Sequence, residues 1–285
     1  MPKIIFDKYH GNGNDFIIID SRNSNIYNSF LKKEIFSVKD LCDRNFGVGA
    51  DGVIFISEPS NNNNDAKMII YNSDNSEAEM CGNGIRCMIE YLHNNKKNQL
   101  EECIYKIETK AGLKVGKYKS GIISVQMGKP IFESNKIPTT IFQKENSIPF
   151  ETFTHKEFSN KGYAVGMGNP HLIIFTDNLE SISYKLLGPI FEKSKYFPEK
   201  TNVHFAQVIN SQKINVKVWE RGAGPTLACG TGACAVHAAA FKLGMCSSKT
   251  DVHLPGGNLN IEWSDNNDDV IMSGNAKKIF NGFIN

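Results

Sequence analysis

The chain has 285 residues, of which 40% are hydrophobic and 22% are charged, and its formal net charge is +2 at pH 7. These values are typical of a globular protein with one large domain or two medium ones. The nearly balanced charge and the lack of a long basic run give no support for a nucleic-acid partner. No stretch approaches about 18 uninterrupted apolar residues, and the charged N-terminal segment has no signal-peptide core, so we expect no membrane association.

The seven cysteines are irregularly spaced and odd in number, which is unlike a disulfide framework in a chain of this length. The pairs Cys81/Cys87 and Cys229/Cys234 are spaced more loosely than a zinc knuckle, so no metal site is predicted. We therefore expect a cytoplasmic protein with reduced thiols.

Segments typical of β-strands dominate the chain, with glycine, asparagine and serine between them. In chain order they lie at 3–10, 15–20, 52–57, 66–71, 103–109, 121–127, 171–175, 203–209, 213–220, 259–263 and 269–274. Helices are predicted at 33–46, 84–95, 181–195 and 231–243. Ser120 and Gly121 predict a hairpin turn. Many strands with a few helices indicate an α+β fold.

The segment GVGADG at 47–52 has the spacing of a dinucleotide-binding loop, G-x-G-x-x-G. Such a loop follows a strand and precedes a helix, whereas here a helical segment precedes it and the strand-like VIFI follows. We interpret the segment as a helix C-cap and a turn, and we predict no cofactor.

An internal repeat divides the chain into two similar parts. HGNGNDFIII at 10–19 resembles GMGNPHLII at 166–174, and 70–84 aligns with 218–232 without a gap. In that alignment Asn72 lies nine residues before Cys81, and Glu220 lies nine residues before Cys229. The paired order predicts two similar halves joined near 128–135.

Both cysteines of the repeat lie where a helix is expected to begin, and each is followed by Gly-x-Gly. The first N–H groups of a helix lack intrahelical partners and carry the positive end of its dipole. That effect is worth about 0.3–1 kcal/mol at exposed sites and up to about 2 kcal/mol when partly buried. The pKa of a thiol at Cys81 could therefore fall from about 8.5 to about 7–8. The glycines let a carboxylate approach the same N–H groups.

If the two halves face one another, the two thiols lie on opposite sides of one substrate carbon. One thiolate then removes an α-proton, and the opposite thiol delivers a proton to the other face. The helix termini stabilise the developing negative charge. This chemistry is that of a two-base racemase or epimerase that uses no metal or organic cofactor.

The chain resembles the diaminopimelate epimerase family in the segments HGNGNDF, YNSDNSEAEMCGNGIRC, MGNPH, KTNVHF and ERGAGPTLACGTGACA, and the likeness runs from residue 8 to the C-terminal IFNGFI. The resemblance implies a cofactor-independent epimerase that interconverts LL- and meso-diaminopimelate for lysine and peptidoglycan synthesis. It implies pseudo-twofold-related halves, each a strongly curved, mostly antiparallel sheet around a central helix, with the active site in the cleft between them. It also implies a homodimer that binds a small-molecule substrate.

On this basis we place the N-terminal half at 1–128 and the C-terminal half at 129–274, with 275–285 returning to the first half as a strand. Carried over residue by residue, the resemblance makes Cys81 and Cys229 the two acid/base residues, supported by Glu220 and His171. The predicted substrate-binding residues are the first residues of the two helices and several polar side chains: Gly82, Asn83, Gly230, Thr231, Asn14, Asn72, Asn169, Asn202, Glu220 and Arg221.

Arg221 can bind the distal carboxylate of diaminopimelate with its two-pronged guanidinium. Oxygens near Asn72, Asn202 and Glu220 can accept hydrogen bonds from the distal ammonium. Gly52 stands where some family members have glutamine, and since glycine offers no side chain, its contact with substrate is left open. The remaining histidines and cysteines are interpreted as structural or surface groups.

Three alternatives stay open. A two-thiol racemase of the same superfamily could act on proline, hydroxyproline or histidine, although the proline group usually has histidine at the position of Asn83. A redox-sensing thiol protein has no C-x-x-C motif to support it. A non-catalytic binding module leaves both thiols unexplained.

Overall fold

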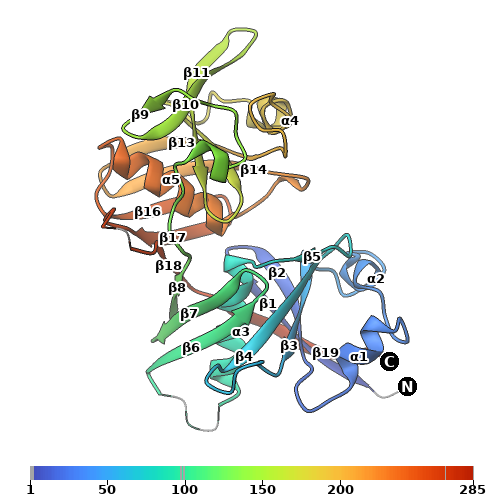
Figure 1. The fold of residues 1–285 in the computed structure, drawn as a ribbon. Helices are drawn as coiled ribbons and strands as arrows, with labels where there is room; N and C mark the ends of the chain where they lie inside the picture. The colour runs from blue at the N-terminus through green and yellow to red at the C-terminus, as the bar shows by residue number, and fades with distance from the viewer. Residues whose placement is uncertain (1–2, 97, 99, 267, 285) are drawn as a thin grey trace. The chain divides into compact units, whose positions relative to one another are not determined.

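The computed structural model describes residues 3–96, 98, 100–266 and 268–284, and it has the predicted α+β fold (Figure 1). The chain divides into two compact units. Unit 1 consists of Met1–Val125 with Gly274–Asn285, and unit 2 consists of Gln126–Ser273. Within the described residues, no helix is both long and apolar enough to cross a membrane.

Unit 1 is a mixed sheet with one central helix. Its elements are β1 (Ile4–Gly11), β2 (Asn14–Asp20), α1 (Ile26–Leu31), α2 (Val38–Cys42), β3 (Gly52–Ser57), β4 (Ala66–Asn72), β5 (Glu77–Ala78), α3 (Gly82–Asn94), β6 (Glu102–Thr109), β7 (Gly112–Lys119), β8 (Ile122–Gln126) and the C-terminal β19 (Lys277–Ile284). The pairs β2–β3 and β4–β6 are parallel, and the other paired strands are antiparallel. Because β1 pairs with β19, the two ends of the chain lie side by side (Figure 1).

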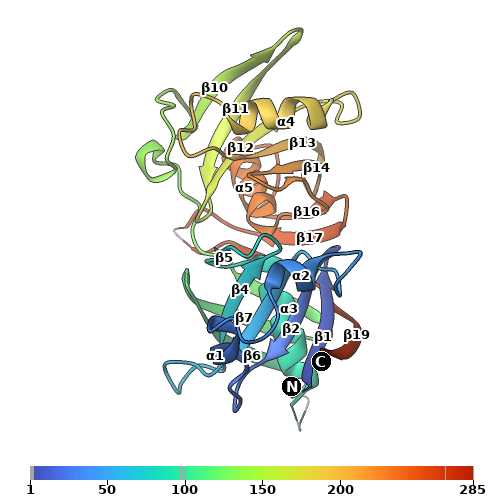
Figure 2. The ribbon, with the colours of Figure 1, turned by 90° about the vertical axis from the view of Figure 1, so that its right-hand side faces the viewer.

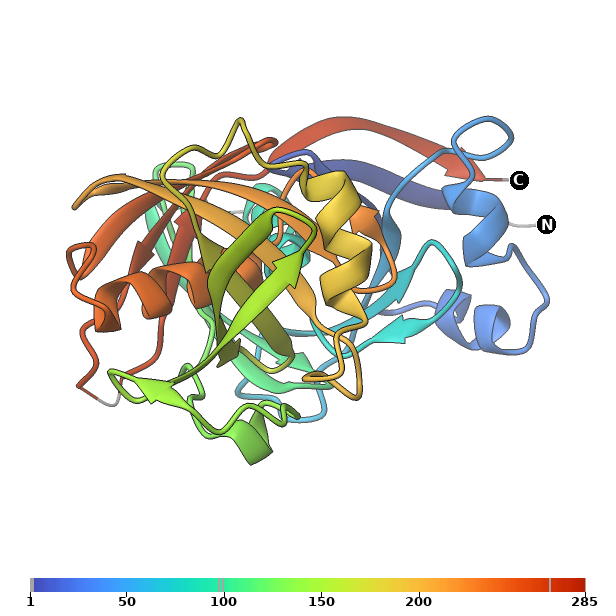
Figure 3. The same cartoon turned by 90° about the horizontal axis from the view of Figure 1, so that it is seen from above.

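Unit 2 is built in the same way. Its elements are the 3-10 helix η1 (Ser134–Lys136), β9 (Lys144–Glu145), β10 (Ile148–His155), β11 (Phe158–Gly166), β12 (Pro170–Phe175), α4 (Tyr184–Glu192), β13 (Asn202–Asn210), β14 (Lys213–Glu220), β15 (Gly224–Pro225), α5 (Gly230–Lys242), β16 (Lys249–Leu254), β17 (Gly257–Glu262) and β18 (Ile271–Gly274). Here β12–β13 and β14–β16 are the parallel pairs. α4 packs on β13 and β14 (Figure 3).

The two units repeat one order of strand pairings. Strands β1 to β4 correspond to β11 to β14, and β5, α3, β6 and β7 correspond to β15, α5, β16 and β17. The antiparallel neighbour of β11 is β10, which precedes it in the chain, whereas the corresponding neighbour of β1 is the distant β19. Unit 1 therefore obtains from the C-terminus the strand that unit 2 obtains from its own hairpin.

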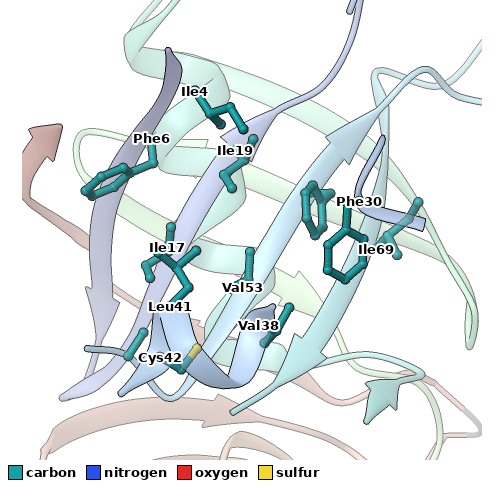
Figure 4. Packing of buried hydrophobic residues seen from close by; sticks show 12 residues of the cluster. Ile4, Phe6, Ile17, Ile19, Phe30, Val38, Leu41, Cys42, Val53 and Ile69 are labelled. Carbon is teal, nitrogen blue, oxygen red and sulfur yellow. The ribbon is translucent and has the colours of Figure 1, made fainter. Parts of the chain in front are cut away.

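Each central helix is enclosed by its own sheet. α3 contacts β1, β2, β3, β7 and β19, and α5 contacts β11 to β14 together with β16 and β17 (Figure 2). In unit 1 the opposite face of the sheet is also covered, since Ile17, Val53 and Phe55 pack with Phe30 and Leu41 of the α1–α2 segment (Figure 4). Burial on both faces explains why β2 and β3 are continuous apolar runs.

The predicted helix at 33–46 was wrong in extent. Lys33 has a positive φ of 59° just after α1, and the chain becomes helical again only over α2. Beyond α2, the N–H of Gly47 donates to the carbonyl of Asp43, and a Cβ on Gly47 would lie 2.1 Å from the carbonyl oxygen of Asp40. Gly49 then takes a φ of +77°, so the interpretation of 47–52 as a turn before a strand is confirmed.

Strands β7, β10, β11 and β16 were missed by the sequence prediction, whereas the C-terminal strand expected at 275–285 is present as β19. β7 and the paired β10–β11 ribbon carry many exposed polar side chains, so their hydrophobic alternation is weak. The hairpin turn between β7 and β8 is confirmed, because Ser120 and Gly121 both have positive φ, at 48° and 83°.

Candidate active site

Each central helix begins at one of the two repeated cysteines. Cys81 is the N-cap of α3 and Cys229 is the N-cap of α5, with backbone angles of −137°/121° and −120°/109°. The sulfur of Cys81 accepts from the N–H of Gly84 at 3.5 Å, and the sulfur of Cys229 accepts from the N–H of Gly232 at 3.4 Å. Both helices therefore start where the sequence pattern indicates, with a thiol as the capping group.

The thiol of Cys81 is partly exposed and faces an amide from β2. Its sulfur lies 3.7 Å from Oδ1 of Asn14, and the same oxygen accepts from Nδ2 of Asn83 at 3.2 Å. Nδ2 of Asn14 donates to Oδ2 of Asp51 at 2.8 Å. Two predicted substrate-binding residues, Asn14 and Asn83, are thus brought to the first turn of α3 beside the thiol.

A cluster of opposite charges lies behind Asn14. The carboxylate of Asp15 is 2.7 Å from Nζ of Lys8 and 2.7 Å from the guanidinium of Arg44, which also contacts Asp51 at 2.8 Å. Lys8 is buried and donates to the carbonyl of Gly49. Burial raises the pKa of Asp15, but hydrogen bonds from Arg44 and Lys8 outweigh it and lower that pKa to about 2.

Arg86 fixes the other side of the helix entrance. Its guanidinium is fully buried and donates to Oδ1 of Asn12 at 2.7 Å and to Oδ1 of Asn83 at 2.9 Å. Because Arg86 binds the side-chain oxygen of Asn83, the NH₂ group of the same amide faces Asn14. Arg86 was not singled out from the sequence, although an arginine on the buried face of a helix is an unusual residue.

Asn72 and Gly52 lie opposite one another at the ends of β4 and β3. Nδ2 of Asn72 donates to Oγ of Ser76 at 3.0 Å, and its side chain is exposed. A Cβ on Gly52 would lie 2.5 Å from the carbonyl oxygen of Tyr71. The backbone in this chain therefore has no room for a larger residue at 52 unless β3 and β4 move apart.

The thiol of Cys229 has different surroundings from that of Cys81. It is 5% exposed, and its sulfur lies 3.6 Å from Oγ1 of Thr231. Burial and the charge of Glu220 raise the pKa of Cys229 well above its ordinary value, despite the hydrogen bonds from Thr231 and Gly232. At Cys229, burial and Glu220 therefore outweigh the lowering of the thiol pKa that a helix N-terminus is expected to cause.

Glu220 and Arg221 occupy the turn between β14 and β15. A carboxylate oxygen of Glu220 accepts from Oγ1 of Thr226 at 2.5 Å. The N–H of Arg221 donates to Oδ1 of Asn202 at 2.9 Å, and its guanidinium donates to the carbonyl of Glu199 at 3.0 Å. Nδ2 of Asn202 donates to the carbonyl of Pro170 at 3.0 Å, so this buried amide ties the Arg221 turn to the start of β12.

The carboxylate of Glu192 also supports this turn, although the sequence reasoning did not select it. It is buried at the end of α4 and accepts from Nε1 of Trp219 at 2.8 Å and from the N–H of Gly222 at 3.1 Å. A buried glutamate with two N–H donors fixes the backbone on both sides of Glu220 and Arg221.

His171 belongs to a buried hydrogen-bond chain. Its Nε2 lies 2.8 Å from Oδ1 of Asn169, and its Nδ1 lies 2.9 Å from Nε2 of His204. With the Asn169 amide in the assigned orientation, one arrangement satisfies both contacts: His204 donates to His171, and His171 donates to Asn169. The remaining nitrogen of His204, Nδ1, is buried without a partner.

Both imidazoles are neutral at ordinary pH. Burial, together with electrostatic repulsion from the neighbouring His204 and Arg221, lowers the pKa of His171 well below its ordinary value, and burial lowers the pKa of His204 to about 3. The sequence reasoning treated His204 as structural. The parallel pairing of β12 with β13 places His171 opposite Asn202, two residues before His204 and on the same face of the sheet, and this pairing was the signal that could have indicated the contact.

The same histidines lie against the Cys229 thiol. Ligand-type atoms of His171, His204 and Cys229 all lie within 4.8 Å of one another, and this is the one such group in the part of the chain that the structure describes. Imidazole and thiolate are donors that suit zinc. However, both ring nitrogens of His171 already take part in hydrogen bonds, to His204 and to Asn169. In this structure the residues therefore form a hydrogen-bond network rather than a set of metal ligands. The absence of a metal stays a prediction.

Comparison with known proteins places this architecture in a family. The profile for diaminopimelate epimerase matches residues 6–133 and 163–279. A diaminopimelate epimerase of Prochlorococcus marinus strain NATL2A is 49% identical over 282 residues, covering 98% of each chain. One from Acaryochloris marina is 43% identical, again with 98% of each chain covered.

This chain belongs to the diaminopimelate epimerase family. The family resemblance inferred from the sequence motifs is thereby confirmed.

Solved structures support the fold of this diaminopimelate epimerase family member at much lower identity. A hydroxyproline epimerase from Agrobacterium vitis has a TM-score of 0.70 at 11% identity, covering 99% of this chain and 92% of its own. A phenazine biosynthesis protein of the PhzF family from Bacillus anthracis has a TM-score of 0.65 at 15% identity, with 100% of both chains covered. At these identities the likeness shows the shared fold and nothing about the substrate.

Proposed function

We propose that this chain is a cofactor-independent epimerase that interconverts LL- and meso-2,6-diaminopimelate, for lysine and peptidoglycan-precursor synthesis. The observation that carries the proposal is the matched pair of sulfur-capped helices. In each unit a cysteine caps the central helix with nearly the same backbone angles. In each, the cysteine sulfur accepts a hydrogen bond from the N–H of the glycine three residues later.

The proposed reaction uses Cys81 and Cys229 as the two acid/base groups. One thiolate removes the α-proton as the C–H electron pair moves into the carboxylate, giving an enediolate-like intermediate. The other thiol then protonates the opposite face of the α-carbon and becomes the thiolate. Over one turnover the proton count is unchanged, and the two cysteines exchange roles in the reverse direction.

The carboxylate of the reacting centre is proposed to bind at the helix N-termini. The N–H groups of the first residues after each cysteine point along the helix axis and have no partner within the helix. The dipole and the N–H groups together favour a negative charge there and stabilise the developing enediolate. The residues proposed for this role are Gly82, Asn83, Gly230 and Thr231.

The distal end of diaminopimelate is proposed to be bound by Arg221 and nearby polar groups. Arg221 offers a guanidinium for the distal carboxylate, and its backbone is fixed by Asn202. Acceptor oxygens of Asn72, Asn202 and Glu220 are proposed for the distal ammonium. Asn14 and Asn169 complete the proposed set, and for Gly52 the close packing leaves only backbone contact.

His171 and Glu220 are proposed to support the Cys229 end. Because the pKa of His171 is depressed, it acts as a neutral group that holds Asn169 and lies close to the thiol. Glu220 raises the pKa of Cys229 and thereby keeps its proton on the sulfur, ready for delivery.

We further propose that the protein works in the cytoplasm as a homodimer through the β1–β19 edge of unit 1. Exposed apolar side chains gather on these two paired strands. Ile5 is 67% exposed, Phe283 is 53% exposed and Ile279 is 52% exposed. Such a patch on a sheet edge is suited to burial against a second copy. Sedimentation of the chain tests this, and a monomer at micromolar concentration would reject it.

The function is tested by incubating the protein with LL-diaminopimelate in deuterated water under reducing conditions. We expect meso-diaminopimelate to form with deuterium at the inverted α-carbon. Mass spectrometry and chiral separation measure both. Parallel incubations with proline, hydroxyproline and histidine test the related racemase reactions. Turnover of one of these without turnover of diaminopimelate would reject the proposed substrate.

A further inference from the structure

The amide of Asn14 is held in one orientation next to the Cys81 thiol. Its Nδ2 donates to Oδ2 of Asp51 at 2.8 Å, whereas its Oδ1 lies 3.7 Å from the sulfur and accepts from Asn83 at 3.2 Å. The two ends of an amide are chemically opposite, since one only donates and the other only accepts. The orientation of this amide therefore decides whether an acceptor or a donor faces the thiol.

Asp51 is itself fixed by contacts to Asp15 and Arg44. Its Oδ2 also accepts from the N–H of Asp15 at 3.0 Å, and its Oδ1 accepts from the guanidinium of Arg44 at 2.8 Å. The N–H of Asp51 donates to the carbonyl of Asp15 at 2.9 Å. Since Arg44 also binds the Asp15 carboxylate, the loop that carries Arg44 and Asp51 is joined to the start of β2.

We propose that Asp51, held by Arg44, is a positioning residue that directs the oxygen of Asn14 at the Cys81 sulfur. A carboxylate only accepts hydrogen bonds, so Asn14 must turn its NH₂ group to Asp51 and its oxygen to the thiol. An acceptor beside the sulfur stabilises S–H over S⁻. Cys81 is thereby kept as a proton donor until substrate enters. The role rests on the proposed function, because it concerns an acid/base group of that reaction.

The negative charge of Asp51 alone also disfavours a thiolate, so the test must separate charge from positioning. Asp51→Asn removes the charge but keeps an oxygen that accepts from Asn14. Asp51→Ala removes both. Arg44→Gln removes a positive charge and loosens Asp51, so charge alone predicts a slower reaction of Cys81 and positioning predicts a faster one.

The experiment measures the rate at which iodoacetamide alkylates Cys81 in the full chain, using peptide-resolved mass spectrometry. The rate is measured from about pH 6 to about pH 9, a range that includes the ordinary pKa of a thiol, and the midpoint pH of its rise is compared between variants. For Asp51→Ala we expect the midpoint pH to fall by about one unit, or about tenfold faster alkylation on the rising limb. Asp51→Asn should stay within about twofold of the unaltered protein, and Arg44→Gln should react about twofold faster. Equal shifts in Asp51→Ala and Asp51→Asn, or slower alkylation in Arg44→Gln, would overturn the proposal.

Two further variants complete the design. If Asp51 acts through Asn14, adding Asp51→Ala to Asn14→Ala should change the midpoint no further, and additive shifts would contradict the proposal. Glu102→Ala is the matched control, because it removes a carboxylate whose partners are Lys117 and Lys119, and it should leave the midpoint unchanged. The Arg44→Gln result decides the matter if Asp51→Ala does not fold, as judged by circular dichroism.

These measurements use no substrate. If the alkylation pattern is as expected but the protein does not epimerise diaminopimelate, the positioning role stands and the proposed function fails. If epimerisation occurs and the alkylation pattern is absent, only the positioning role fails.

Discussion

The two thiols occupy the same place in a repeated fold but have opposite surroundings. In unit 1 the groups behind Cys81 are ions: Lys8, Asp15, Arg44 and Asp51 form a connected network. In unit 2 a fully buried pair of neutral imidazoles and the carboxylate of Glu220 lie near Cys229. The repeated topology fixes where each thiol lies, whereas the side chains around it set its protonation separately.

The protonation of each thiol is therefore controlled by a different set of groups. At Cys229, burial and Glu220 favour the protonated form. At Cys81, the sulfur is partly exposed and faces an amide whose orientation depends on Asp51. Because these groups differ, a substitution can change the protonation of one thiol without altering the surroundings of the other.

The largest expected effect comes from removing either thiol. Cys81→Ala and Cys229→Ala should each lower kcat/KM for diaminopimelate by at least about 10³-fold, because one acid/base group is lost in each direction of the reaction. Steady-state kinetics in both directions measure this. Cys103→Ala is the matched control, since Cys103 lies on β6 and its sulfur contacts the Leu100 carbonyl and the Tyr105 side chain rather than a proposed site residue. Substantial turnover in either site variant would refute the two-base reaction.

Glu220→Gln should have the next largest effect, and it should act on Cys229. Removing the charge lowers the pKa of that thiol, so its alkylation should begin at lower pH. We expect kcat to fall by about 10²-fold because the proton is less firmly held for delivery. Glu180→Gln, which removes a carboxylate paired with Lys217, is the control and should behave as the unaltered chain. An upward shift at Cys229 would show that Glu220 does not act through charge.

The units should respond to acid at different pH. His204, whose pKa in the folded chain is about 3, binds its proton more readily when unfolded, so stability falls as pH decreases from about 6.5 toward 3. The slope is up to about 1.4 kcal/mol per pH unit for each such histidine. Hydrogen exchange resolved by peptide should therefore show unit 2 opening first on acidification.

Unit 1 should resist until lower pH, because Asp15 also loses its contribution to stability on acidification but does so in a lower pH range than His204. The folded-state pKa of Asp15, about 2, lies below its unfolded value of about 3.9. Its contribution is thus present above pH 4 and lost as pH falls toward 2. His204→Gln should flatten the unit 2 response, while His155→Gln on β10 should not. Simultaneous opening of both units at pH 5 would remove the proposed contrast.

The smallest expected effect is at the distal end of the substrate. Arg221→Lys should raise KM by about fivefold with little change in kcat, because a point charge replaces a two-pronged contact remote from the reacting carbon. Initial-rate measurements over a range of diaminopimelate concentrations separate the two constants. Arg22→Lys, whose guanidinium pairs with Asp20, is the matched control. A large fall in kcat with unchanged KM would place Arg221 at the reacting centre instead.

Much of the fold was predictable because local pattern and burial agree. The apolar runs of β2 and β3, and the Gly-x-Gly after each cysteine, gave the buried strands and the two helix starts. β10 and β11 were missed because exposed polar side chains interrupt the hydrophobic alternation where the two strands pair, over 150–155 and 158–163.

The site was less predictable from the sequence, because its support comes from long-range contacts. Asp51 reaches Asn14 across 37 positions of the chain, and His171 reaches His204 across 33. No periodicity or short motif encodes such distances. Burial likewise reversed the expected effect of the helix terminus at Cys229, and burial is a property of the packed unit that a cysteine motif does not contain.

The contrast between the thiols is tested most directly by their relative rates of alkylation in the substrate-free protein at pH 7. Peptide-resolved mass spectrometry after brief treatment with iodoacetamide measures both in one sample. Partly exposed Cys81 should react at least about tenfold faster than buried Cys229, whose raised pKa leaves it as a thiol. Equal rates, or faster reaction at Cys229, would contradict the claim that one repeated fold holds its two thiols in opposite surroundings.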